Sequence, residues 1–306
     1  MDTFKTLLEQ TLRDLQTRAN SSNPVPGIPT GFRELDRILG GFSNSDLIVV
    51  GARPAMGKST FFINMALTQA LVYNIPVLFY SMEKATNQII RQILSYMSGI
   101  EGNKISCGSL TSEEWQRLTE ATSKLGNDIP LYIVSNPPYD ITQFCKEAKE
   151  TVAHTAAKII YIDNLHLFSS FLGAQNRYEE IAACTRELKH LAKELNIPIV
   201  MASQINRNPE HRSPNSTEHY KPYMYDLRDS GTICEDSNVV ILLDRPEIKY
   251  RSYEDPNGNN IRGLVEVIIA KNHMGPEDTI RLRFKPEIAK MDNWEDDDYL
   301  PLQTYH

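Results

Sequence analysis

The sequence has few cysteines and no long apolar segment. Only four cysteines occur among its 306 residues: Cys107, Cys145, Cys184 and Cys234. No two of them form a CxxC pair, which argues against a zinc site or a disulfide framework and favours a reducing cytoplasm. No apolar run approaches the ~20 residues that cross a bilayer, so we expect no membrane association. The opening residues, MDTFKTLLEQ, mix an acid with polar residues and do not resemble a signal peptide.

An excess of positive charge is also missing. Lysine and arginine total 32 against 39 aspartates and glutamates, which gives a formal net charge of −7. A simple basic nucleic-acid-binding protein would carry the opposite sign. A ring can hold a basic lining inside an acidic exterior, so composition neither supports nor excludes contact with DNA. The hydrophobic fraction of 41% is that of an ordinary globular protein with a sizeable core.

The two ends of the chain differ from its middle. Four apolar residues recur at helical spacing on one face near the start: Phe4, Leu8, Leu12 and Leu15. They predict a helix over residues 3–19, which the Asn-, Pro- and Gly-rich residues 20–29 end. This helix either packs back on its own domain or docks on a neighbouring subunit. Residues 295–306 begin with a run of acids and predict a solvated tail.

Between the ends, short β-rich runs alternate with longer stretches of helical spacing. The β-rich runs are residues 46–50, 76–81, 130–135, 158–163, 198–203, 238–244 and 264–271. Helical spacing occupies, among others, residues 60–72, 87–97 and 181–195. This alternation predicts an α/β fold with parallel strands joined by crossover helices. Only loops separate the last strands, which predicts hairpins at the sheet edge. Residues 204–230 predict a long polar loop, of a kind that is usually functional or disordered.

A phosphate-binding loop follows the first strand. It consists of Ala52, Arg53, Pro54, Ala55, Met56, Gly57, Lys58 and Ser59, and it leads through Thr60 into a helix. The spacing is that of a P-loop, with Ala52 where Gly is usual. Backbone N–H groups of such a loop converge on phosphate oxygens at a helix N-terminus. Gly57 permits the close approach, Lys58 supplies charge to the β- and γ-phosphates, and Ser59 ligates Mg²⁺. We therefore predict binding of a nucleoside triphosphate with Mg²⁺.

Three polar side chains at strand ends are candidates to complete this site. The carboxyl ends of parallel strands converge on one crevice, so residues there meet. Asp163 is placed to hold Mg²⁺ through water, or it caps an ordinary turn. Glu83 is placed to act as general base on the attacking water, although the helix dipole also favours a surface glutamate at a helix start. Gln204 either senses the γ-phosphate or merely caps its strand.

Taken in order, these motifs resemble the bacterial replicative DNA helicases of the DnaB type, in their C-terminal RecA-like motor domain. The matching segments are GIPTGFRELDRILGGF (27–42), RPAMGKS (53–59), LFYSMEK (78–84), IIYIDNLHLF (159–168), ELKHLAKELNIPIVMASQINR (187–207), DLRDSGTICEDSNVVILLDR (226–245) and IIAKNHMGP (268–276). The resemblance implies a RecA-like P-loop NTPase fold, ATP and Mg²⁺ as cofactors, and a hexameric ring that translocates on single-stranded DNA in replication. It also implies primase and a helicase loader as partners.

The resemblance divides the chain and assigns further residues. It implies a linker helix and connector over 1–26, a motor domain over 27–294 and an acidic tail over 295–306. Lys58, Ser59, Asp163 and Glu83 keep the roles given above, and Gln204 becomes the γ-phosphate sensor. The loop facing the central channel would place three residues against the DNA backbone: Arg228, Asp229 and Gly231. Such contacts carry no sequence information, which suits a motor. A surface salt bridge with Asp226 or Asp229 is the alternative for Arg228.

Two departures from the family pattern bear on function. The family's Lys-x-Arg, whose cations reach the neighbour's γ-phosphate, here reads Lys271-Asn272-His273. Histidine lacks the guanidinium fork and is largely neutral at pH 7. We also expect no counterpart of the family's N-terminal collar, so residues 3–19 would be the linker helix that packs on the adjacent motor domain. The alternative function is therefore a slow or inactive nucleotide-dependent DNA-binding or assembly protein without the primase-binding collar. A RecA-like recombinase or a KaiC-like ATPase is a third hypothesis.

Overall fold

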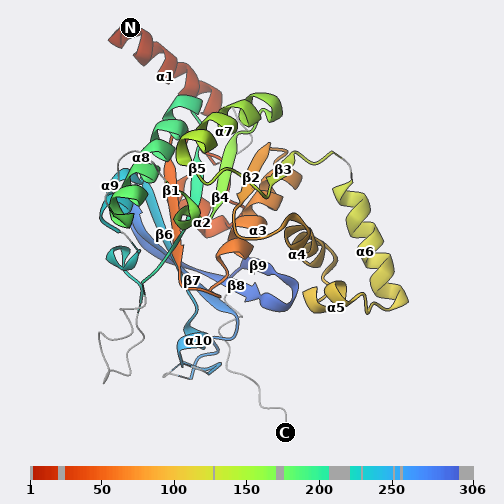
Figure 1. Cartoon of the computed structure of the whole chain (residues 1–306). Helices are drawn as coiled ribbons and strands as arrows, with labels where there is room; N and C mark the ends of the chain where they lie inside the picture. The colour runs from red at the N-terminus through yellow and green to blue at the C-terminus, as the bar shows by residue number, and fades with distance from the viewer. Residues whose placement is uncertain are drawn as a thin grey trace.

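A central β-sheet organises the chain. The computed structural model describes residues 3–19, 25–126, 128–169, 176–206, 221–228, 230–250, 252–255 and 258–295. Within these residues, nine strands form one sheet in the order β3-β2-β4-β5-β1-β6-β7-β8-β9 (Figure 1). The strands are β1 (Leu47–Ala52), β2 (Val77–Ser81), β3 (Leu131–Val134), β4 (Ile159–Asp163), β5 (Ile199–Gln204), β6 (Val239–Asp244), β7 (Leu264–Asn272), β8 (Asp278–Lys285) and β9 (Lys290–Asn293).

The mode of strand pairing changes once across this sheet. All pairings from β3 to β6 are parallel, and those from β6 to β9 are antiparallel. The predicted mostly parallel sheet with antiparallel strands near the C-terminal edge is therefore confirmed. The inner parallel strands β1, β2, β4, β5 and β6 are buried on both faces, as their continuous apolar runs require, whereas β3 at the edge is partly exposed. Their carboxyl ends share one edge, and the loops that follow β1, β2, β4 and β5 start there.

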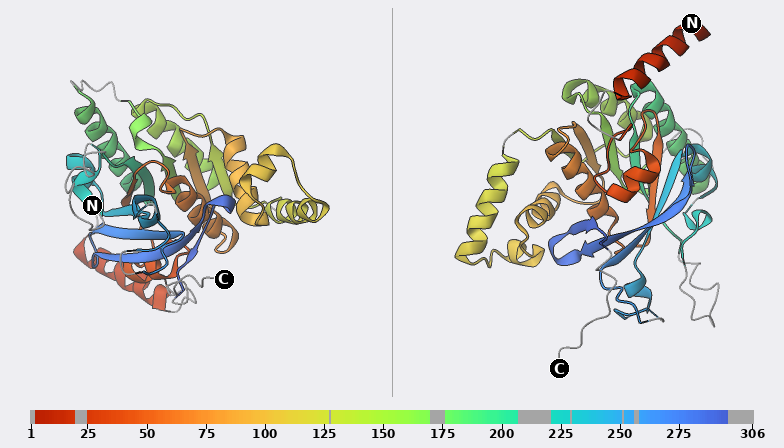
Figure 2. Two further views of the ribbon diagram at one scale, coloured as in Figure 1. Left: turned by 90° about the horizontal axis from the view of Figure 1, so that it is seen from below. Right: turned by 180° about the vertical axis from the view of Figure 1, so that it is seen from behind.

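Helices cover both faces of the sheet (Figure 2). They are α1 (Phe4–Ala19), α2 (Arg33–Leu39), α3 (Lys58–Leu71), α4 (Thr86–Ser98), α5 (Gly102–Cys107), α6 (Ser112–Leu125), α7 (Ile141–Thr155), α8 (Arg177–Leu195), α9 (Ser230–Asp236) and α10 (Pro246–Tyr250). Short 3-10 turns are η1 (Leu165–Leu167), η3 (Met224–Asp226) and η4 (Pro286–Ile288). Along β1, Ile48 and Val50 pack with α2, α3 and α4, whereas Leu47 and Val49 pack with α7, α8 and α9. This alternation of strand side chains builds two cores, one on each face.

The predicted helical stretches correspond to α3, α4 and α8, with shifted starts. The helix predicted over 181–195 begins earlier, at Arg177, because the Asn176 side chain accepts a hydrogen bond from the backbone N–H of Glu179 and caps it. The predicted loop over 204–230 is partly structured, since it contains η3 and leads directly into α9. Its residues 207–220 lie outside the described part of the chain.

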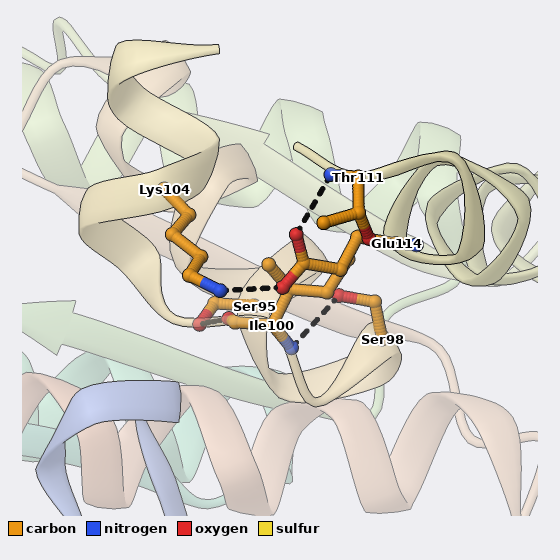
Figure 3. A network of polar contacts seen from close by, with 6 residues as sticks. All are labelled: Ser95, Ser98, Ile100, Lys104, Thr111 and Glu114. Carbon is orange, nitrogen blue, oxygen red and sulfur yellow. Dashed lines mark hydrogen bonds and ion pairs between the residues drawn. The ribbon is translucent and has the colours of Figure 1, made fainter. Parts of the chain in front are cut away.

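Helices α4, α5 and α6 form an arm beside the sheet, with α6 farthest from it (Figures 1 and 2). Polar contacts hold the arm together (Figure 3). The Lys104 ammonium on α5 lies 2.7 Å from the Glu114 carboxylate on α6, which also accepts a 2.9 Å hydrogen bond from the backbone N–H of Thr111. The Ser95 hydroxyl on α4 donates to the carbonyl of Ile100 at 2.6 Å. These bonds fix the turns between the three helices.

The N-terminal helix α1 projects away from the body of the domain (Figure 1). Its apolar residues Phe4, Leu8 and Leu12 are 81%, 48% and 51% exposed, so they are not buried against their own domain. The burial of the Leu15 side chain lies outside what the structure describes. Among the described residues, no helix combines the length and apolarity needed to cross a membrane.

Candidate functional site

The loop between β1 and α3 has the backbone geometry of a phosphate cradle. Gly57 has a φ of 97°, which favours glycine, and it lies directly before the first residue of α3. A Cβ at Gly57 would come within 2.6 Å of the Met291 side chain, so packing as well as φ selects glycine there. The backbone N–H groups at the start of α3 therefore open onto the loop. Ala52, at the departure from the usual glycine, is buried as the last residue of β1.

This loop lines a pocket of about 360 Å³ at the carboxyl edge of the parallel strands. The pocket brings together five of the residues predicted from the sequence: Lys58, Ser59, Glu83, Asp163 and Gln204. Arg53, Pro54, Ala55, Gly57 and Thr60 of the loop also line it, whereas Ala52 and Met56 do not. Four distant segments of the chain thus converge because β1, β2, β4 and β5 are parallel neighbours.

The two predicted metal ligands are in direct contact. The Ser59 hydroxyl donates to Oδ2 of Asp163 at 2.6 Å, and Asp163 is only 3% exposed. Burial raises the pKa of the Asp163 carboxyl, and the bond from Ser59 and the charge of Lys58 oppose that shift. A hydroxyl and a carboxylate are the hard oxygen ligands that Mg²⁺ takes alongside phosphate and water. The described residues contain no cluster of three or more His, Cys, Asp or Glu, so these two ligands suit a metal that arrives with phosphates.

Lys58 and Glu83 line the same pocket and carry opposite charges that attract each other. Burial lowers the pKa of the Lys58 ammonium, and the carboxylates of Asp163 and Glu83 oppose that shift. Glu83 is exposed at the rim, in a turn that Ser81 closes by accepting from the backbone N–H of Lys84 at 3.2 Å. Removing this ammonium from water leaves it ready to bind phosphate oxygens.

Gln204 joins the pocket to the predicted DNA-facing segment. Its side chain lines the pocket, and its carbonyl accepts a 2.8 Å hydrogen bond from the backbone N–H of Arg228. An isolated bridge between Ile205 and Leu227 extends this pairing. The Arg228 side chain is exposed, and Asp229 lies outside the described residues.

Contacts of Gly231 and Asp226 fix the position of the segment that carries Arg228. A Cβ at Gly231 would lie 2.5 Å from the Tyr178 hydroxyl, so α9 and α8 meet closely at their starts. The Asp226 carboxylate is buried and accepts a 2.8 Å hydrogen bond from the backbone N–H of Tyr223.

Lys271 and His273 lie at the opposite edge of the sheet from the phosphate loop. Lys271 belongs to the end of β7 and His273 follows that strand, where Asn272 pairs with Val239 at the amino end of β6. The backbone N–H of His273 donates to the carbonyl of Asn238 at 3.0 Å, and the His273 side chain is exposed. Lys271 Nζ donates to the carbonyls of Cys234 and Ser237, each at 2.6 Å. Lys271 and His273 are therefore separated from the phosphate loop of their own chain by the whole length of β1, whose residues rise by roughly 3.3 Å each.

Four pocket residues were not predicted: Lys84, Arg245, Phe284 and Pro286. Lys84 Nζ lies 3.3 Å from Gln92 Oε1, and Gln92 donates to the Thr60 hydroxyl at 2.9 Å, which connects the Glu83 turn to α3. Arg245 donates to the carbonyl of Ala55 and lies over the Phe284 ring at 4.7 Å. Arg245 follows the end of β6, so the reasoning used for Asp163 would have found it. Phe284 carries no such signal, because it lies on an antiparallel strand.

His166 is a further residue that the sequence analysis missed. It lies on η1, three positions after Asp163, and its Nε2 is 3.1 Å from the Ser203 hydroxyl on β5. Burial lowers the pKa of His166 to about 4, and the cationic side chains of Arg228, Arg177 and Lys58 lower it further. The imidazole is therefore neutral at pH 7 and links the segment after Asp163 to the strand that ends at Gln204.

This depressed pKa predicts an acid sensitivity that belongs to His166. The folded chain binds fewer protons at this ring than the unfolded chain does between pH 6.5 and 4, so stability is full above pH 6.5 and falls as the pH decreases through that window. We expect His166 to account for a loss of roughly 1–3 kcal/mol in the free energy of unfolding at pH 4.5. Thermal unfolding of wild type and His166→Gln between pH 7.5 and 4.5 measures it. The variant should lose less stability on acidification, and His154→Gln, at an exposed position, should behave as wild type. Parallel losses in all three proteins would contradict the prediction.

The parallel sheet, the loop before α3 and the Ser59–Asp163 contact together define a P-loop nucleotide-binding domain. The chain belongs to the DnaB-like helicase C-terminal domain family, whose profile matches residues 27–293. It is 34% identical over 95% of its length to the replicative DNA helicase DnaB of Geobacillus stearothermophilus. It has the same identity and coverage with the replicative DNA helicase DnaC of Bacillus subtilis. The chain spans 62% of the length of each of these relatives.

Solved structures agree with this family. The ATPase domain of G40P superposes with a TM-score of 0.85 at 26% identity, over 96% of this chain and 100% of that one. A DnaB-like replicative helicase, studied for its interactions with primase, gives 0.82 at 25% identity, over 96% of this chain and 68% of that one. A KaiC-like protein of Pyrococcus horikoshii, at 17% identity and a TM-score of 0.57, shares the fold alone. The predicted RecA-like fold and the resemblance to DnaB-type helicases are confirmed.

Proposed function

We propose that this chain is an ATP-hydrolysing motor of a replicative DNA helicase that translocates on single-stranded DNA as a hexameric ring. The observation that carries the proposal is the hydrogen bond between Arg228 and Gln204, because it joins the predicted DNA-facing segment to the wall of the phosphate pocket. The names of the relatives, replicative DNA helicases, support the same function. A role in DNA replication, as the names of these relatives give it, fits the predicted cytoplasmic location.

Within one subunit, each pocket residue has a separate role in ATP hydrolysis. Residues 52–60 form the loop for the phosphates of ATP, which are bound by the Lys58 ammonium and by the backbone N–H groups of the loop residues other than Pro54. Ser59 and Asp163 would hold Mg²⁺, with Asp163 acting through water, and a bound ion would supply positive charge beside the β- and γ-phosphates. Glu83 accepts a proton from the attacking water, which its place at the open rim of the pocket allows. Gln204 contacts the γ-phosphate and signals its loss along its own main chain to Arg228.

The remaining catalytic groups come from the neighbouring subunit. Lys271 and His273 lie at the edge of the sheet away from their own phosphate loop, and His273 is exposed. A ring in which each subunit presents this edge to the pocket of the next would place both side chains at the neighbour's γ-phosphate. Arg228, Asp229 and Gly231 then line the channel and contact the DNA backbone. Primase and a helicase loader stay predictions, and a DnaB-like structural relative is known for its interactions with primase.

One experiment tests the proposed function directly. ATP hydrolysis is measured with and without a poly-dT oligonucleotide, alongside the mass of the assembly by light scattering. We expect a hexamer whose rate rises at least tenfold with single-stranded DNA. A hexamer with no DNA-stimulated rate would overturn the motor. It would favour the second candidate, a nucleotide-dependent binding or assembly protein, which the histidine at position 273 supports.

The exposed face of α1 is proposed to dock on the adjacent motor domain, and this predicts an assembly defect. Leu8→Glu with Leu12→Glu should dissociate the ring. Burial of each exposed leucine side chain against the neighbouring subunit would stabilise the assembly by about 1.5–3 kcal/mol, and glutamate loses this contribution. Light scattering and sedimentation measure the loss of hexamer. Thr6→Glu with Arg13→Glu changes the charge more, but on the opposite side of the helix, and should leave the hexamer intact. A hexamer that persists in the leucine variant would refute this role of α1.

A further inference from the structure

Two tyrosines stand exposed beside the segment that carries Arg228. Tyr223 and Tyr225 are 53% and 60% exposed, although aromatic side chains usually bury most of their surface. Their rings are stacked, with centroids 5.3 Å apart and planes inclined by only 9°. The pair therefore presents flat aromatic surface to solvent rather than filling the core.

The backbone holds this pair rigidly. In η3, the Asp226 carboxylate accepts from the backbone N–H of Tyr223 at 2.8 Å, and the backbone N–H of Asp226 donates back to the Tyr223 carbonyl at 2.9 Å. Met224, between the two tyrosines, packs against the core. The inward methionine fixes the outward direction of its neighbours, so their exposure is built into the turn.

The turn is also attached to the nucleotide pocket. The backbone N–H of Asn206 donates to the Asp226 carbonyl at 2.8 Å, and that of Arg228 donates to Gln204 at the same distance. The Leu227 side chain packs so closely on β1 that a Cβ at Gly51 would come within 2.3 Å of it. A displacement at the end of β1 or β5 would therefore move the tyrosine pair.

We propose that Tyr223 and Tyr225 form a stacking platform for the bases of single-stranded DNA. The proposal rests on the proposed function, and it adds contact with bases to the backbone contact expected of Arg228. Single-strand binding sites combine cations that follow the backbone with aromatic rings that stack on bases of any sequence. Here the exposed cation Arg228 follows the pair in the chain, and Lys221, whose ammonium forms an ion pair with Glu266 at 3.2 Å, precedes it. Asp226, the acid between these two cations in the chain, is buried as the cap of η3.

Base stacking can be separated from phosphate binding with an abasic strand. We compare binding of a labelled dT oligonucleotide and an abasic oligonucleotide of equal length by fluorescence anisotropy, with a non-hydrolysable ATP analogue present. Wild type should prefer dT, and Tyr223→Ala with Tyr225→Ala should weaken dT binding about tenfold, as expected for ~1.4 kcal/mol of stacking, without changing abasic binding. Tyr223→Phe with Tyr225→Phe should keep the preference, because phenylalanine retains the ring.

Controls distinguish this proposal from the proposed function. Tyr132→Ala with Tyr139→Ala removes two other exposed tyrosines and should bind both oligonucleotides as wild type does. Arg228→Ala should weaken both oligonucleotides alike and reduce the salt dependence of binding. Wild type that binds dT and the abasic strand equally would overturn the stacking platform and leave the motor standing. Loss of the hexamer in the tyrosine-to-alanine variant would also overturn it, since the pair would then be a subunit contact. Failure of wild type to bind either strand would overturn the proposed function.

Discussion

Replacing Glu83 with glutamine is expected to reduce the DNA-stimulated ATPase rate by about 10²–10⁴-fold, the range for loss of a general base. Glutamine has nearly the same size and leaves the turn between Ser81 and Lys84 intact, but its amide cannot accept the proton of the attacking water. Nucleotide affinity should change little, because Lys58 and the loop backbone bind the phosphates. Steady-state hydrolysis with saturating single-stranded DNA measures the rate, and a fluorescent ATP analogue measures binding.

The matched control for this experiment is Glu150→Gln, an exposed glutamate on α7 far along the chain from the pocket. It makes the same chemical change and should keep the wild-type rate. If Glu83→Gln hydrolyses ATP as fast as wild type, Glu83 is not the base and another group must accept the proton. A fall in affinity equal to the fall in rate would instead show that Glu83 serves binding.

Restoring an arginine at position 273 is expected to raise the rate of hydrolysis by about 10²-fold or more. A trans arginine contributes a factor of ~10³–10⁵ to the rate of related reactions, and an imidazole, which lacks the guanidinium fork, supplies only part of that. The substitution has room, because His273 is exposed on the turn after β7. The assay is the DNA-stimulated ATPase of hexameric His273→Arg against wild type. A gain of this size would identify wild type as a damped motor of the DnaB kind.

Two variants sharpen the experiment at position 273. His273→Lys adds charge without the guanidinium fork and should give a smaller gain. His154→Arg makes the same change on an exposed helix position and should give none. Rings that mix His273→Arg subunits with Lys58→Ala subunits would test whether the arginine acts on a neighbour. No gain in any ring would mean that position 273 does not limit the reaction, and the second candidate function would gain support.

The phosphate pocket could be predicted because its residues follow from a rule of parallel sheets. Asp163, Glu83 and Gln204 each follow or end a recognisable apolar strand, and the carboxyl ends of parallel strands share an edge. The sequence therefore indicated the Ser59–Asp163 neighbourhood without any tertiary information. The same rule would have found Arg245.

Other features depend on contacts that no local pattern contains. Phe284 reaches the pocket from β8 because three antiparallel strands bring the C-terminal edge around to the phosphate loop. The bonds from Lys271 to Cys234 and Ser237 join segments more than thirty residues apart. The resemblance assigned roles to Arg228 and Lys271, but it said nothing of the tyrosines at 223 and 225.

In the proposed ring, the position of Lys271 would set the direction in which one subunit communicates with the next. An ammonium has three N–H donors, and two of them already bind carbonyls at the end of α9, so one remains for a phosphate oxygen of the adjacent subunit. The lysine can therefore touch the neighbour's nucleotide without releasing its own helix. That helix begins two residues after Arg228. The state of one nucleotide would thus reach the predicted DNA-contacting loop of the next subunit through α9 alone. Successive subunits of the proposed ring would then hydrolyse ATP in order rather than at random.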